Sequence, residues 1–266
     1  MTTDDLDVVC GVCRCGGKDI GMTDERWMLV FESSRERSVL PVGLRVQVGQ
    51  SLRAGRHGDL PVGVELDDRG ISRNAATVTA TETGWAVEIT NTHGAVVHPW
   101  AQAPFPAAGH QTLSWPRVAI RLLNGAAPGG EAAGHRHWLL LEADGIPVEA
   151  DGPRRTANTT SRTAEAERPP ELTPSQHEAL ALVFAEYLQW WPIRPDPAVR
   201  KLYTVAHRLK ISETGVKARL SNAREKAQRL GLHRTVGLTD PEYLFTLVRA
   251  GFLPLRGPRP HRRLLY

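Results

Sequence analysis

Three short polar segments of the sequence contain residue types that bind phosphate groups. Arg56 ends the segment AGR, Ser72 and Arg73 lie in GISRNA after an acidic turn, and a third segment, TNTHG, spans 90–94. A guanidinium presents several planar donors to a phosphate dianion, and a short hydroxyl adds a neutral donor. If the fold brings the three segments together, they form a phosphate-binding site. Otherwise they are polar turns between strands.

The overall composition favours a globular protein of two domains. The chain has 266 residues, of which 41% are hydrophobic, which is enough to form the hydrophobic cores of two domains of ordinary size. No apolar run is long enough to span a bilayer, and the N-terminal residues MTTDDLDVV are acidic where a secretion signal is basic. We therefore expect a cytoplasmic protein with no membrane partner.

The three cysteines form one cluster near the N-terminus. Cys10, Cys13 and Cys15 lie in CGVCRC, with no second pair or histidine partner at the spacing of a zinc motif. His135 and His137 are remote in sequence and are expected to flank a strand. A reduced tail is favoured over a thiolate metal site, and we expect no metal and no cofactor.

Charge divides the chain into two unequal parts. Residues 1–170 carry 17 Lys and Arg against 21 Asp and Glu, whereas residues 171–266 carry 16 against 8. A basic C-terminal part is typical of a domain that binds a polyanion, although solubility alone is a sufficient reason for such a surface.

The region 26–148 shows the pattern of an all-β sandwich, and it follows an N-terminal tail, 1–25, that carries the cysteines. Short apolar runs at period two alternate with Gly, Pro, Asn and Asp, and no stretch keeps a helical period. The expected strands are WMLVF, LRVQV, VGVEL, TVTAT, WAVEI, AVV, VAIRLL and WLLLEA. A multidomain protein with an antiparallel sandwich at its N-terminal side is therefore predicted.

The region 149–170 is predicted to be a flexible linker, because it contains no large apolar residue. The region 171–252 then changes to a helical period and is predicted to be all α. Its first helix has Thr173 as N-cap, Pro174 at the first helical position and Gln176 in a capping box. Further helices are expected over 198–210, 213–230 and 240–250, followed by a loose basic tail, 253–266.

The order of features in the sandwich resembles the forkhead-associated (FHA) domain, an eleven-strand β-sandwich that binds phosphothreonine peptides through loops at one end. The resemblance covers Arg26 to Asp144. The family pattern is a G-R pair, then S-x-x-H, then an N-G pair, and this sequence matches it in strand context at Arg56, Ser72 and Gly94. It implies that Arg56 faces the phosphate, that Ser72 donates to a phosphate oxygen and that Arg73 supplies a second cation. Thr92 matches the position before the N-G pair. The implied partners are a phosphothreonine-containing protein and a Ser/Thr kinase.

Two positions depart from the FHA pattern. Ala75 stands where the family has a histidine that supports the loop, and His93 stands where it has the asparagine that holds the ligand backbone. Asn91, after a small shift of the loop, or His93 itself is expected to make that contact. The alternative is a sandwich that has lost phosphate binding and binds an unphosphorylated protein.

The C-terminal domain resembles the helix-turn-helix of LuxR-type proteins and of sigma-factor region 4, in a plain or winged form, over Leu172 to Leu232. The predicted helix 213–230 has an inward apolar stripe and a separate polar stripe. The resemblance implies that the polar stripe binds double-stranded DNA. The expected base contacts are Thr214, Lys217 and Ser221, and the expected phosphate contacts are Arg219, Arg224 and Lys226.

The turn of this second resemblance also departs from its family. Lys210 lies where a glycine is expected, so the turn is predicted to use another backbone conformation. The alternative use of the domain is protein docking.

No motif of catalysis accompanies these features. The sequence has no Walker loop, no G-x-S-x-G elbow and no H-E-x-x-H, so we expect no enzyme activity. The favoured function is a transcriptional regulator downstream of a Ser/Thr kinase, and the alternative is an adaptor that assembles protein complexes without DNA. A further hypothesis is self-association through phosphorylated threonines of the tail and linker, namely Thr2, Thr3, Thr156, Thr159, Thr160 and Thr163.

Overall fold

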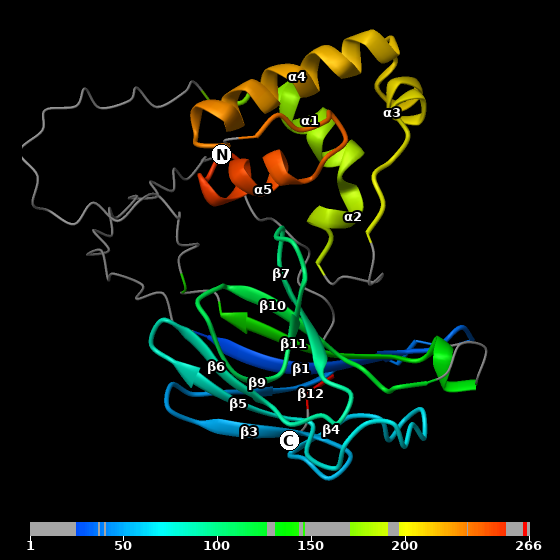
Figure 1. The fold of residues 1–266 in the computed structure, drawn as a ribbon, viewed down its shortest axis with the longest axis vertical. Helices are drawn as coiled ribbons and strands as arrows, with labels where there is room; N and C mark the ends of the chain where they lie inside the picture. The colour runs from blue at the N-terminus through cyan, green and yellow to red at the C-terminus, as the bar shows by residue number, and fades with distance from the viewer. Residues whose placement is uncertain are drawn as a thin grey trace, which may run out of the picture.

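The computed structural model describes two domains, a β-sandwich and a group of helices (Figure 1). The described residues are 25–36, 38–39, 41–126, 131–143, 146, 171–190, 197–232, 234–253 and 263–264. The cysteine cluster, the predicted linker and the threonines named for self-association lie outside them.

Within the described part of the chain, the sandwich has eleven strands in two sheets, as the predicted fold class requires. They are β1 (Arg26–Ser33), β2 (Val42–Arg45), β3 (Ser51–Gly55), β4 (Leu60–Pro61), β5 (Ala76–Thr81), β6 (Gly84–Ile89), β7 (Ala95–Pro99), β8 (Phe105–Ala107), β9 (Gly109–Leu113), β10 (Arg117–Leu122) and β11 (Arg136–Ala143). One sheet has the order β2-β1-β11-β10-β7-β8, and the other has the order β4-β3-β5-β6-β9. The strand pairs are antiparallel except for β3 with β4.

A short strand from the C-terminal tail joins the first sheet. Strand β12 (Arg263–Leu264) pairs in parallel with β2, opposite Val42 and Gly43. The tail was expected to be loose, and for these two residues that expectation is wrong, because their backbone extends the sheet edge.

Two of the predicted strands differ from the structure, and one of these, LRVQV, overlaps β2 only at Leu44 and Arg45. The segment VGVEL is not a strand, since 64–67 form turns and the short β4 ends at Pro61. Its alternation of apolar residues arises within a turn that buries Val62 and exposes Val64. Strands β8 and β9 were not predicted, because their sequences, FPA and GHQTL, have little apolar alternation.

The helical domain contains α1 (Pro174–Val183), α2 (Ala185–Leu188), α3 (Leu202–Leu209), α4 (Glu213–Arg229) and α5 (Glu242–Arg249). The predicted capping box is present, since the Thr173 hydroxyl accepts from the Gln176 N–H and the Gln176 side chain accepts from the Thr173 N–H. The predicted first helix is interrupted at Phe184, and α3 begins at Leu202 rather than 198.

The connection between α3 and α4 uses a left-handed residue. Lys210 has φ 54° and ψ 41°, and Ser212 then caps α4 by accepting from the Gly215 N–H. The expectation that lysine would force a different turn is therefore wrong. Lys210 adopts the left-handed conformation that a glycine at this position would adopt, at a steric cost that glycine would avoid.

The two domains share a hydrophobic interface on the outer face of the β1–β11–β10 sheet. Alternate residues of β1 and β11 point to opposite sides, so that Leu29 and Leu140 join the core of the helical domain while Met28 and Leu139 join the core of the sandwich. This double burial explains why β11 is buried along almost its whole length.

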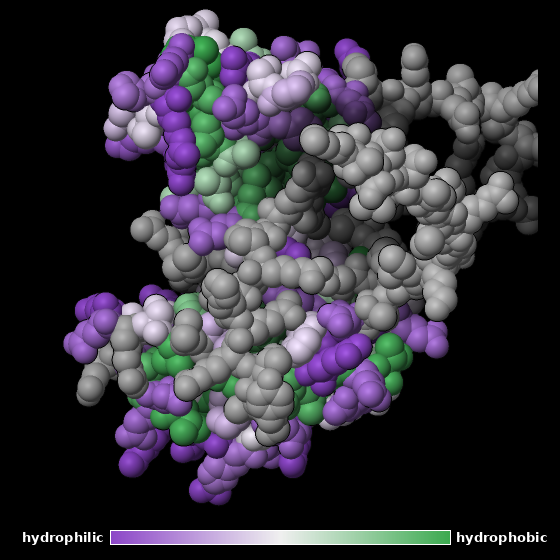
Figure 2. Space-filling view, turned by 180° about the vertical axis from the view of Figure 1, so that it is seen from behind, coloured by the Kyte–Doolittle hydropathy of each residue, from purple (hydrophilic) through white to green (hydrophobic). Residues whose placement is uncertain are grey.

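Two tryptophans add polar contacts to this interface. Trp100, after β7, donates from Nε1 to the Leu188 carbonyl at 2.9 Å, and Trp190 donates from Nε1 to Glu142 Oε1 at 2.8 Å. The connection after β7 reaches toward α2 (Figure 1). On the face shown in Figure 2, hydrophilic side chains are prominent at the outer parts of both domains, and an apolar strip of the helical domain runs between hydrophilic groups. None of the described helices is both long and apolar enough to cross a bilayer.

Candidate functional site

The three polar segments singled out in the sequence meet at one end of the sandwich, together with a fourth. The Arg56 N–H donates to the Ser72 carbonyl at 3.1 Å, and the His57 N–H donates to the Arg73 carbonyl at 2.9 Å. The Leu123 N–H donates to the Gly94 carbonyl at 3.2 Å. We refer to segments 55–58, 70–75, 90–94 and 123–126 as the loop cluster.

Arg56 is anchored by one nitrogen of its guanidinium. The half-buried side chain donates from Nε to the Ile71 carbonyl at 2.7 Å, and its two terminal nitrogens make no hydrogen bond to any residue in the described ranges. The backbone of the Arg73 segment lies close to Gly55, where an added Cβ would be 2.4 Å from the Arg73 carbonyl oxygen. Glycine also allows the φ of 149° at this position. The arrangement fixes the direction of the side chain and leaves two donors for a ligand.

A pair of hydroxyls lies in the adjacent loops. Ser72 Oγ lies 3.0 Å from Thr92 Oγ1 and accepts from the Thr92 N–H at 2.9 Å. Ser72 is half-buried and Thr92 is exposed. Because the backbone N–H already occupies one acceptor position on Ser72 Oγ, its proton is available to Thr92 or to a bound anion.

Asn91 holds the loops together from inside. It is 6% exposed, its Oδ1 accepts from the Ser72 N–H at 3.1 Å, and its Nδ2 donates to the carbonyls of Gly94 at 2.8 Å and Leu123 at 2.7 Å. Its amide is thus occupied within the protein. The sequence nominated Asn91 as a peptide contact, and the structure shows its side chain hydrogen-bonded to Ser72, Gly94 and Leu123 of the protein itself.

The remaining predicted residues of the sandwich lie on the outside of the loop cluster. Arg73 is exposed and makes no side-chain hydrogen bond or ion pair with the described residues. His93 is exposed, and its ring lies directly over Gly125, where an added Cβ would come within 2.3 Å of it. Gly125 has φ 65°, so backbone conformation and space both favour glycine there.

The six residues predicted to contact DNA lie on α4 and divide into two groups. Arg224 donates to the Val236 carbonyl at 3.0 Å, and Lys226 donates to Gln176 Oε1 at 3.2 Å and to the Glu171 carbonyl, so both cations bind within the domain. Thr214 is exposed, and Lys217 is exposed and paired with Glu213 at 2.7 Å.

The last two of the six residues, Arg219 and Ser221, follow Thr214 and Lys217 along α4. Arg219 is half-buried and makes no side-chain hydrogen bond or ion pair with the described residues, and Ser221 donates to Glu225 at 3.5 Å. Thr214 and Lys217, in the N-terminal half of α4, are therefore the exposed members of the six.

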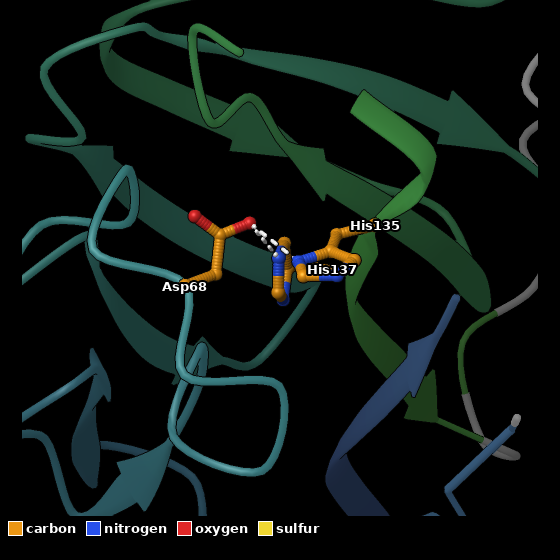
Figure 3. A group of neighbouring side chains, drawn as sticks. All are labelled: Asp68, His135 and His137. Atoms are coloured by element: carbon orange, nitrogen blue, oxygen red, sulfur yellow. Dashed lines mark hydrogen bonds and ion pairs between the residues drawn. The ribbon is translucent and has the colours of Figure 1, made fainter. Parts of the chain in front are cut away.

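A second cluster of polar side chains, three of which are drawn in Figure 3, was missed in the sequence. It adjoins the loop cluster, because Asn124 Nδ2 donates to Asp68 Oδ2 at 2.7 Å. His137 of β11 lies between two carboxylates, with Nδ1 2.5 Å from Glu32 Oε1 and Nε2 2.8 Å from Asp68 Oδ2. His135 Nδ1 lies 3.2 Å from the same Asp68 oxygen. We call Glu32, Asp68, His135 and His137 the acid–histidine cluster.

The protein stabilises the charged forms of this cluster. Burial raises the pKa of Asp68, but hydrogen bonds from Asn124, His137 and the Gly70 N–H outweigh it, and the pKa lies below its usual range. Burial lowers the pKa of His137, but its two carboxylate partners outweigh burial and raise the pKa. The spacing H-x-H was the available signal, because side chains two apart in a strand share a face. Glu32, however, is 105 residues away in sequence.

No protein-family model matches the sequence, and no curated protein matches it. Two solved structures of FHA domains are similar to part of the chain. The FHA domain of the CT664 protein from Chlamydia trachomatis is 16% identical, with 44% of this chain and 96% of that chain covered and a TM-score of 0.29. The FHA-1 domain of Rv1747 from Mycobacterium tuberculosis is 12% identical, with the same coverage and a TM-score of 0.24. Likeness at this level does not assign a function to this chain.

Proposed function

We propose that the sandwich binds phosphothreonine peptides through the loop cluster. The observation that carries this proposal is Arg56, whose Nε is fixed on the Ile71 carbonyl while its terminal nitrogens remain available. Charge-assisted hydrogen bonds from a guanidinium to phosphate are among the stronger polar contacts, and fixing the side chain in advance lowers the entropy lost on binding.

The neighbouring side chains fit the same ligand. Ser72 adds a hydroxyl held in place by the Thr92 N–H, and the exposed Arg73 adds a second cation to offset the phosphate dianion. His93 and Thr92 lie beside them on the outside of the loop cluster and are proposed to contact the peptide backbone. Asn91 supports these loops without touching the peptide.

The test is a titration of a fluorescent phosphothreonine peptide library, with unphosphorylated peptides as reference. Arg56→Ala is expected to weaken binding about tenfold or more, which corresponds to ~1.4 kcal/mol or above. Arg53→Ala is the matched control, since this arginine lies three residues earlier on β3 and pairs with Asp59 at 3.5 Å. Equal and weak binding by wild type and Arg56→Ala would show that the sandwich binds its partner without phosphate.

The helical domain supports a second proposed function, DNA binding as part of a transcriptional regulator controlled by a Ser/Thr kinase. The supporting observation is the turn at Lys210 followed by the exposed first turns of α4, with Thr214 and Lys217. The affinity for duplex DNA is expected to fall steeply as the salt concentration rises. The slope of log affinity against log salt is expected to be smaller for Lys217→Ala than for the sandwich control Arg53→Ala. Absence of binding at low salt would favour the alternative, an adaptor of protein complexes.

A further inference from the structure

The acid–histidine cluster has the donor atoms and spacing of a metal site. Asp68 Oδ2, His135 Nδ1 and His137 Nε2 all lie within 4.8 Å of one another, and Asp68 Oδ2 is 2.8 Å and 3.2 Å from the two imidazole nitrogens. Tetrahedral Zn²⁺ with bonds of ~2.0 Å places its ligands about 3.3 Å apart. Small outward movements of the side chains would therefore accommodate the ion.

The partners of these three residues orient the donor atoms. Glu32 lies at 2.5 Å from Nδ1 of His137, and Glu32 Oε1 also accepts from the Gly63 N–H at 2.7 Å. A carboxylate on one imidazole nitrogen directs the lone pair of the other nitrogen toward a metal, the arrangement that commonly surrounds zinc-bound histidines. Here that other nitrogen, Nε2, points at Asp68 (Figure 3).

Asp68 is also prepared for coordination. Its Oδ1 accepts from the Gly70 N–H at 2.9 Å, and its Oδ2 accepts from Asn124 Nδ2 at 2.7 Å, which leaves lone pairs on Oδ2 directed at the histidines. The side chains of Asp68 and His137 are 2% and 1% exposed, whereas that of His135 is 15% exposed. Solvent thus reaches the cluster beside His135, where a water would complete four-coordination.

The charge of the site points to a cation as well. Two carboxylates, Glu32 and Asp68, are buried around His137, and a protonated imidazole offsets only one of their two negative charges. A divalent ion that takes the place of the hydrogen bond between His137 and Asp68 would balance both carboxylates.

We propose that Asp68, His135 and His137 bind a divalent transition-metal ion of the zinc class, with Glu32 positioning His137. The ion would join the loop that carries Ser72, four residues after Asp68, to the start of β11, and so brace the loop cluster where the family histidine is absent. The proposal stands on its own donor set and does not require that the loop cluster bind phosphate.

The test measures metal binding by the full-length chain, stripped with chelator, in which Cys10, Cys13 and Cys15 are replaced by serine to remove thiolate ligands. Isothermal titration with Zn²⁺ is expected to show one site per chain. The Co²⁺-loaded protein is expected to show the visible absorption of a tetrahedral site.

Two variants and one control assign the ligands. His135→Ala, at the more exposed ligand, is expected to weaken Zn²⁺ binding at least tenfold, and Glu32→Gln is expected to weaken it about 10- to 100-fold while the stoichiometry stays at one. His110→Ala, on an exposed position of β9, is expected to bind as tightly as the parent. Circular dichroism checks that each variant is folded. No Zn²⁺ binding by the folded parent, or equal binding by folded His135→Ala, would overturn the proposal and leave a protonated ion-pair cluster.

Discussion

Asn91 connects three loops with a single buried amide. Its hydrogen bonds to the Ser72 N–H and to the Gly94 and Leu123 carbonyls fix the segment that carries the Ser72 hydroxyl. The support for the Ser72 segment therefore comes from a residue of a neighbouring loop, through hydrogen bonds that satisfy both the oxygen and the nitrogen of its amide.

Asn91→Ala is expected to lower the free energy of unfolding by about 1–3 kcal/mol, since it removes the hydrogen bonds of a buried amide to the part-buried Ser72 N–H and Leu123 carbonyl. Denaturant unfolding measures the loss. Asn74→Ala is the matched control, because Asn74 is exposed and its side chain makes no hydrogen bond with the described residues, and it is expected to change stability by less than ~0.5 kcal/mol. A loss no larger than that of the control would contradict the supporting role.

At the scale of the element, the turn between α3 and α4 carries a cost that one substitution removes. Lys210 adopts φ 54°, and a left-handed conformation costs an L-residue about 1–2 kcal/mol relative to glycine. Lys210→Gly is therefore expected to raise the free energy of unfolding, by about 0.5–1 kcal/mol after the entropy of glycine in the unfolded chain is counted.

The control for this prediction is the same substitution in a helix. Lys217→Gly, inside α4, is expected to lower the free energy of unfolding by about 1 kcal/mol, because glycine weakens a helix interior and the pair with Glu213 is lost. Thermal unfolding of both variants gives the comparison. A loss of stability in both would mean that the Lys210 side chain contributes more than its backbone costs.

Elements with local signals were predictable from the sequence, and those defined by distant contacts were not. Thr173 and Gln176 lie three residues apart and specify a helix start by themselves. The prediction of a strand at VGVEL was wrong, because an alternation of apolar residues does not distinguish a strand from a turn that buries some of its residues. Arg56 and Ser72 were nominated from spacing, but the link between Glu32 and His137 depends on the pairing of β1 with β11.

At the scale of the whole molecule, the two domains are joined by side chains as well as by the chain itself. Trp100 and Trp190 have ring centroids 6.0 Å apart, and each donates a hydrogen bond across the interface. The outer faces of β1 and β11 continue into the helical core. A ligand on one domain can influence the other only if it favours one of two arrangements of this interface, so the interface is the element to perturb.

Trp190→Phe is expected to weaken the coupling between the domains, because it deletes the hydrogen bond to the buried Glu142 while keeping most of the ring. Calorimetry is expected to show unfolding separating into two transitions, with a loss of about 1.5–3 kcal/mol for the charge-assisted contact. Trp85→Phe is the control, because Trp85 is buried between the two sheets, away from the helices. It is expected to lower the stability of the sandwich without changing the number of transitions. If both variants unfold in one transition with equal loss, the contact between Trp190 and Glu142 does not couple the domains.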